Sequence, residues 1–190
     1  GSNNSDLGTG KITLSVKSKT ASSKFTDVTA SNVGSWAADS IDFCADNDLV
    51  NGKSTYSFAP KDNLTRGQLV AILYRAAGSP SVTGTTNPFN DVKTGDYYYN
   101  AVLWAYKNDV VNGTGAGKFS PNANVTREQI AAILYRYMGS PAATGSLSGY
   151  TDRSKISSWA TTAMQWAIGK GYITGTSSTT LDPRGQATRA

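Results

Sequence analysis

Leu64-Thr65-Arg66-Gly67-Gln68 is the stretch of sequence that decides the fold, because it carries a helix-start pattern and recurs along the chain. The pattern returns at residues 125–129 and begins again at residues 187–190. In the first two copies a Thr is followed three residues later by a Gln, which is typical of a capping box. Each copy therefore predicts the first turn of an α-helix.

The residues after each helix start predict how far the helix runs and which of its faces is buried. Apolar side chains recur at i, i+3, i+4 and i+7, a spacing that places one face of a helix in a core. Each pattern ends at a Gly followed by Ser and Pro, a helix stop signal. The two apolar stripes are Leu69, Ile72, Leu73 and Ala76, and then Ile130, Ile133, Leu134 and Tyr137.

An arginine in the first helical turn is unusual, since a cation there opposes the helix dipole at a cost of about 0.3–1 kcal/mol. It occurs at the same register three times, as Arg66, Arg127 and Arg189. A solvated side chain is one interpretation. The other is an anion site, because free helix N–H groups attract anions and the guanidinium can hold a carboxylate or phosphate with two bonds.

Composition narrows the classes of function. The chain has 190 residues, 18 Lys and Arg against 13 Asp and Glu, and no His. Scattered positive charge does not favour nucleic acid, which calls for denser basic runs, and fits an acidic polymer of lower charge density. No stretch is apolar enough to predict membrane insertion. The lack of His removes the usual general base and the commonest metal ligand, so no enzyme activity, cofactor or metal is expected.

From residue 25 onward the sequence repeats with a period of about 61 residues, which indicates a repeat architecture. The boundaries are 25–87, 88–149 and 150–190, and residues 1–24 form a tail or the end of a preceding domain. Within that tail, alternating Ile12, Leu14 and Val16 predict a strand. Every unit reads as a helix, a Gly turn, a short extended piece, a Pro and then the Thr-Arg helix start.

The order of these motifs within each unit resembles the S-layer homology family over residues 25–190. The likeness implies a mostly all-α fold, with three pseudo-threefold repeats in a three-pronged spindle around a central helical bundle. It implies an extracellular, cell-surface protein that is anchored non-covalently to the bacterial cell wall. The implied partner is an acidic secondary cell-wall polysaccharide, commonly carrying a pyruvylated amino sugar.

The resemblance also implies a set of ligand-binding residues. It comprises the motif arginines, the aspartates that open each unit, one aromatic residue per unit and the turn glycines: Arg66, Arg127, Arg189, Asp27, Asp91, Asp152, Trp36, Tyr97, Trp159, Gly52, Gly113 and Gly175. Arginine suits the carboxylate of the pyruvyl ketal, and a flat aromatic suits a sugar ring. Glycine lets backbone approach a ligand closely.

Alternatives remain for several of these residues. The aspartates could tie down a loop, and the three aromatics could belong to the core. Phe43, Trp104 and Trp166 share a helical face with these aromatics and are predicted to be core. Cys44 corresponds to Ala105 and Ala167 in the other units, so it is interpreted as a small core residue rather than a reactive thiol.

The third unit departs from the family pattern because it stops at its helix start. Arg189 is therefore expected on a frayed end, and the stripes of the two encoded core helices are expected to face a gap. A longer parent chain is the favoured way to cover that gap; the alternatives are self-association through the incomplete repeat and the alternating Ile12, Leu14 and Val16 of the tail. The alternatives to wall anchoring are a self-assembling surface-layer protein and the anchoring module of a larger secreted enzyme.

Overall fold

The computed structural model describes residues 21–190, so the strand predicted around Ile12, Leu14 and Val16 lies outside the described residues. The regular secondary structure of the described chain is helical, and in place of named strands it holds only isolated β-bridges. Its elements are α1 (Ala30–Val33), α2 (Ser35–Asp46), α3 (Arg66–Ala76), α4 (Tyr99–Lys107), α5 (Arg127–Tyr137), η1 (Arg153–Lys155), η2 (Ser158–Ala160) and α6 (Thr161–Gly169).

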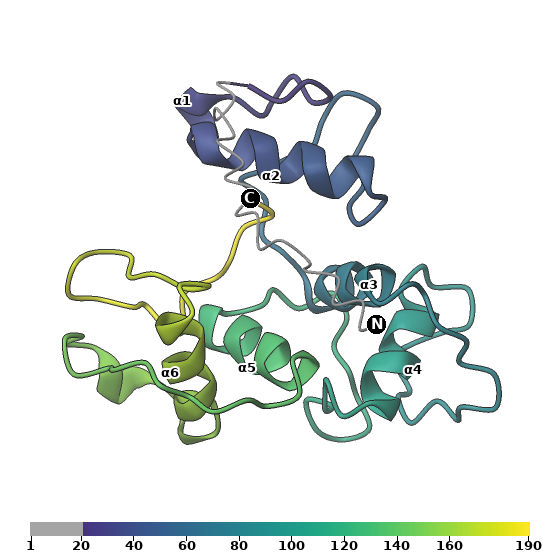
Figure 1. Ribbon diagram of the computed structural model, residues 1–190. Helices are drawn as coiled ribbons and strands as arrows, with labels where there is room; N and C mark the ends of the chain where they lie inside the picture. Colours follow the sequence, from purple (N-terminus) through teal and green to yellow (C-terminus); the bar gives the residue numbers. More distant parts are fainter. Residues whose placement is uncertain (1–20) are drawn as a thin grey trace, which may run out of the picture.

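Three lobes radiate from a common centre, as the sequence repeat and the family resemblance imply (Figure 1). One lobe contains α2, one contains α4 with α3, and one contains α6 with α5. The mostly-α class with three repeats is confirmed. Each core helix packs on the first long helix of the following repeat, so α3 covers α4 and α5 covers α6.

The two core helices start as their sequences predict. Thr65 Oγ1 accepts a hydrogen bond from Gln68 N–H at 3.3 Å, and Gln68 Oε1 accepts one from Thr65 N–H at 3.1 Å. Thr126 and Gln129 repeat this capping box with the same two distances. The helix stop signals are also confirmed, since both following glycines adopt a positive φ.

At the centre, the three helix starts are joined by a closed ring of backbone hydrogen bonds. Leu64 N–H donates to Ala187 O (2.9 Å), Ala187 N–H to Val125 O (3.0 Å) and Val125 N–H to Leu64 O (2.9 Å). Each repeat therefore donates to a second repeat and accepts from a third. This arrangement gives the pseudo-threefold axis and fixes the relative positions of all three helix starts.

A second ring of hydrogen bonds holds the first helical residues. Gly67 N–H donates to Pro121 O and Glu128 N–H donates to Pro183 O, both at 2.8 Å. Ala190 N–H donates to Pro60 O at 3.2 Å in the equivalent place. The third helix start is thus seated like the other two, which corrects the expectation of a frayed end.

The apolar surface that lacks a covering helix lies on α2. The sequence analysis expected it on the apolar stripes of the core helices. Leu69, Leu73 and Ile133 of those stripes are buried. Trp104 on α4 is 8 % exposed beneath α3, and Trp166 on α6 is 2 % exposed beneath α5, but the equivalent Phe43 is 63 % exposed. The prediction of a core position is confirmed for the two tryptophans and wrong for Phe43, because within residues 21–190 no core helix packs on α2 as α3 packs on α4.

Candidate functional site

Each motif arginine reaches from its own repeat to the next one. The Arg66 guanidinium donates from Nε to Phe119 O (2.9 Å) and from Nη2 to Asn112 O (3.2 Å), and it stacks 4.7 Å from the Phe119 ring centroid. Arg189 bonds Phe58 O and Asn51 O, each at 2.9 Å, in the same way. Arg127 bonds Leu181 O and Thr174 O. The three arginines therefore clamp neighbouring repeats together.

The opening aspartates hold the loop that each arginine grips. Asp91 accepts hydrogen bonds from Phe119 N–H and Ser120 N–H, both at 2.8 Å. Asp27 and Asp152 accept equivalent bonds in their own repeats. These contacts correspond to the loop-tying alternative, because each carboxylate binds the peptide whose carbonyl receives the arginine.

The hydrogen bonds also set the charge state of these aspartates. Burial acts to raise the pKa of Asp91, but the bonds from Phe119 and Ser120 outweigh it and hold the pKa below its usual value. The same balance lowers the pKa of Asp27. For Asp152 the bond from Leu181 N–H is the largest influence, and the pKa is again lowered. All three are carboxylates at neutral pH.

The turn glycines are needed for a close approach within the turn. A Cβ at Gly52 would lie 2.7 Å from Ser57 O, and one at Gly113 would lie 2.7 Å from Lys118 O. At Gly175 the corresponding contact is 2.8 Å from Thr180 O. The missing side chains thus let the two sides of each turn come together, and the turn presents the carbonyl that the motif arginine binds.

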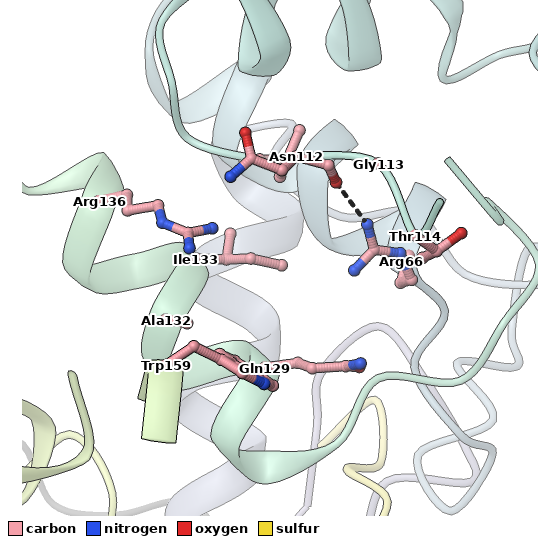
Figure 2. A pocket seen from close by; sticks show the side chains of 10 residues that line it. Arg66, Asn112, Gly113, Thr114, Gln129, Ala132, Ile133, Arg136 and Trp159 are labelled. Carbon is pink, nitrogen blue, oxygen red and sulfur yellow. Dashed lines mark hydrogen bonds between the residues drawn. The ribbon is translucent and has the colours of Figure 1, made fainter. Parts of the chain in front are cut away.

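Two polar grooves lie between the repeats. The first groove has a volume of about 380 Å³ and combines parts of all three repeats (Figure 2). Its lining residues are Arg66, Val111, Asn112, Gly113, Thr114, Gln129, Ala132, Ile133, Arg136 and Trp159. Cations and amides face it, and none of these lining residues is acidic.

The second groove is built in the same way one repeat further round. Its volume is about 290 Å³, and its lining includes Arg189, the turn at Asn51 and Gly52, Arg75 of α3, and Tyr97. Lys53 adds a further cation, although it also forms an ion pair with Asp62. This lining is again free of carboxylates, so both grooves present positive charge and an exposed aromatic ring.

The structure therefore brings the sequence-predicted residues together in a cyclic order. Each groove takes its arginine from one repeat, its glycine from the next and its aromatic from the third. Arg66 meets Gly113 and Trp159, and Arg189 meets Gly52 and Tyr97. The remaining set comprises Arg127, Gly175 and Trp36, and Trp36 instead lines an apolar pocket on α2.

The sequence analysis did not predict two of the residues that line the grooves. Arg75 and Arg136 each stand nine residues after a motif arginine, in the last turn of α3 and α5. Arg75 shares a helix face with Ala71 and Ile72, and Arg136 shares one with Ala132 and Ile133, so that each arginine lines its groove from the core helix. Their repetition at the same register was the available signal, but a basic residue in a last helical turn also suits the helix dipole and needs no ligand.

Comparison with known proteins identifies the repeats. The chain matches the S-layer homology domain over residues 24–70, 88–131 and 149–190. It is 31 % identical to an amylopullulanase of Thermoanaerobacterium thermosulfurigenes over 82 % of this chain and 8 % of that protein. It is 28 % identical to a surface-layer 125 kDa protein of Lysinibacillus sphaericus over 83 % of this chain and 13 % of the relative.

A third relative is a cellulosome-anchoring protein of Acetivibrio thermocellus, 24 % identical over 70 % of this chain and 31 % of the relative. The chain thus spans less than a third of the length of each of these proteins. Within residues 21–190, no helix has the length and hydrophobicity needed to span a membrane, and no cluster of acidic, Cys or His side chains could hold a metal ion.

Proposed function

Because this chain belongs to the S-layer homology domain family, we propose that it anchors a secreted protein to the bacterial cell wall by binding an acidic, pyruvylated secondary cell-wall polysaccharide. Domains of this family are non-catalytic anchoring modules, and the location of the chain is extracellular, at the cell surface. The finer proposal concerns the ligand: one carboxylate-bearing sugar in each of the two grooves.

The observation that carries this proposal is the composition of the grooves. Each combines at least two cationic side chains with no carboxylate and with one exposed aromatic ring. A charge-assisted bond to arginine is stronger than a neutral one, so an anionic sugar gains more here than a neutral sugar does. The ring of Trp159 or Tyr97 offers an apolar surface to the carbon face of a sugar.

The relatives are consistent with a module that is independent of its cargo. Their names describe an amylopullulanase, a surface-layer protein and a cellulosome-anchoring protein, and each matches this chain over less than a third of its own length. We infer that the protein anchored by this module is a further surface protein or secreted enzyme. Self-association into a surface lattice is the competing function, favoured by the exposed Phe43 on α2.

A binding assay with purified wall polysaccharide tests the proposal. Tyr97→Ala and Trp159→Ala should each weaken binding about fivefold, the order expected for loss of one aromatic contact. Removing the pyruvyl groups from the polysaccharide should weaken binding more strongly. Trp36→Ala is the matched control, because that exposed tryptophan lies outside both grooves and its loss should leave binding unchanged.

The competing function predicts a different result. If the parent protein binds depyruvylated and native polysaccharide equally, the acidic-ligand proposal is wrong. If it binds neither but forms larger species in light scattering as its concentration rises, the module assembles with itself instead.

A further inference from the structure

The motif arginine of the first groove is largely occupied by protein contacts. Arg66 is 7 % exposed, and its Nε and Nη2 groups both donate to backbone carbonyls of the second repeat. Its ring contact with Phe119 fixes the plane of the guanidinium. The side-on fork of Nε and Nη2 is therefore taken by protein, and a carboxylate can reach Arg66 only at the Nη1 end unless it displaces an inter-repeat contact.

Arg136 enters the same groove from the opposite side. In Figure 2 its guanidinium lies on the α5 side, facing Arg66 across the pocket, with Asn112 above and Trp159 below. Among residues 21–190 it forms no hydrogen bond and no ion pair to a protein acceptor. Its side chain is half-buried, so water only partly screens the charge.

The positive charges of Arg66 and Arg136 also repel each other. Burial is the main cause that lowers the pKa of Arg66; the charge of Asp91 opposes that shift and the charge of Arg136 adds to it. Like charges in a partly buried groove destabilise each other. A bound carboxylate would relieve this repulsion, and the planar guanidinium of Arg136 can donate two parallel hydrogen bonds to it.

The second groove has the same layout with one difference. Arg189 is committed to Phe58 O and Asn51 O, as Arg66 is to its own two carbonyls. Arg75 is the counterpart of Arg136, but its Nη1 donates to Leu49 O at 3.1 Å. The helix-end arginine of the second groove is therefore partly restrained, whereas that of the first groove is not.

We propose that Arg136 is the residue that binds the ligand carboxylate in the first groove, and that Arg66 acts as a clamp between repeats. Arg75 takes the carboxylate in the second groove with lower affinity, because binding there competes with the bond to Leu49. This assignment rests on the proposed function. It places the recognition of the ligand's charge at the end of each core helix rather than at the repeated Thr-Arg start.

Calorimetric titration with two small probes tests the assignment. The first probe is N-acetylmannosamine carrying a 4,6-pyruvyl ketal, and the second is its neutral methyl ester. Arg136→Gln should lose about tenfold or more in affinity for the acid, little for the ester, and keep the melting temperature of the parent. Arg136→Lys should recover part of the loss, since it restores charge without the planar fork.

Two further variants complete the design. Arg66→Gln should lower the melting temperature, because it leaves Phe119 O and Asn112 O without their donor. Arg153→Gln is the matched control: this exposed arginine bonds only the nearby carbonyls of Ser148 and Tyr150 and lies outside both grooves. It should match the parent in affinity and in stability.

The outcomes separate this inference from the proposed function. If the parent binds wall polysaccharide and Arg136→Gln keeps the parent's preference for acid over ester, the assignment is overturned while the anchoring function stands. If Arg66→Gln abolishes the preference at an unchanged melting temperature, the motif arginine is the receptor and the assignment is again wrong. If the parent binds no wall polysaccharide, the proposed function fails and the assignment fails with it.

Discussion

At the start of each repeat, a single aspartate holds the loop whose carbonyl binds the motif arginine of the preceding repeat. Asp91 binds the peptide N–H groups of Phe119 and Ser120, and Phe119 O in turn receives Arg66. Ser120 has a φ of 59°, a left-handed conformation that a non-glycine residue adopts only when its surroundings hold it there. The aspartate supplies that restraint, so its effect extends to the position of the arginine.

Asp91→Asn is therefore expected to destabilise the protein by about 1–3 kcal/mol at pH 7, because an amide NH₂ would face a buried peptide N–H. The pKa of Asp91 is lowered by folding, so its stabilising effect is complete above the unfolded value of about 3.9 and is lost as pH falls through the folded value. Urea denaturation at pH 7 and near pH 2.5 measures this.

The difference between Asp91→Asn and the parent should shrink as pH falls, because protonation of the parent carboxylate removes its charge-assisted hydrogen bonds. Asp109→Asn serves as the control, because this exposed aspartate makes no such contact and Asn tolerates its φ of 56°. An Asp91→Asn protein as stable as the parent at pH 7 would show that the loop is held by other contacts.

At the level of helices, the second residue of each core helix fits the space that the following repeat leaves for it. In α3 the second residue is Gly67, and a Cβ there would lie 2.8 Å from Cδ1 of Tyr98. In α5 the same position is Glu128, whose carboxylate accepts from Ser157 N–H and Oγ–H, both at 2.8 Å. A small residue therefore faces a large ring in one interface, and a large residue occupies the space in the other.

Gly67→Ala tests this packing. Helix propensity alone would stabilise α3 by about 1 kcal/mol, but the contact with Tyr98 should reverse the sign and leave a net loss. In a double-mutant cycle, Gly67→Ala should cost less when combined with Tyr98→Ala than it does in the parent, giving a coupling of about 0.5–3 kcal/mol.

Gly95→Ala is a suitable reference for that cycle, since no atom lies within 4 Å of a Cβ placed there. Additive effects of the Gly67 and Tyr98 changes would mean that the two side chains do not compete for the same space. Thermal unfolding of the four proteins supplies the necessary free energies.

The sequence predicts the local elements well because their causes are local. The capping boxes, the glycine stops and the three-repeat order depend on residues within one turn or one repeat. The burial of Phe43 was wrongly predicted from the same periodicity that correctly placed Trp104 and Trp166. Periodicity identifies which face of a helix seeks cover, whereas the cover comes from a core helix of another repeat.

Across the whole molecule, the composition of each groove follows from threefold packing and not from spacing along the chain. The sequence supplies one motif arginine, one turn glycine and one aromatic residue per repeat, but it does not say which of them meet. The ring of hydrogen bonds among Leu64, Val125 and Ala187 rotates each contact by one repeat, so that Arg66 lies with Gly113 and Trp159. Nothing in a linear sequence specifies that rotation, which arises only when three units share one axis.

The last prediction concerns the third helix start, which lies beside α2. Thr188, Arg189 and Ala190 occupy the positions of a helix start, and the apolar pocket beside them is lined by Trp36, Ala37, Ser40, Ile41, Cys44, Val50, Phe58, Arg189 and Ala190. In the other two repeats a tyrosine of the core helix packs on the buried tryptophan, with ring centroids 5.7 Å apart for Tyr74 and Trp104 and 5.6 Å apart for Tyr135 and Trp166.

A chain extended beyond Ala190 by the sequence of residues 68–78 should therefore place a third helix on α2. Its tyrosine would cover Phe43, and full burial of such a side chain contributes about 1.5–3 kcal/mol. Cys44 reports on this directly, because it is half-buried now and its equivalents Ala105 and Ala167 are fully buried. Its reaction with a thiol reagent should slow at least about tenfold, and the melting temperature should rise.

An extension with serine in place of its leucines and isoleucine is the control, since it adds the same length without an apolar stripe. Unchanged thiol reactivity and melting temperature in the apolar extension would contradict the prediction. A slow thiol reaction in the unextended chain that becomes faster on dilution would point instead to a second copy covering α2. The two results distinguish a helix added to the same chain from a dimer, because only the dimer depends on protein concentration.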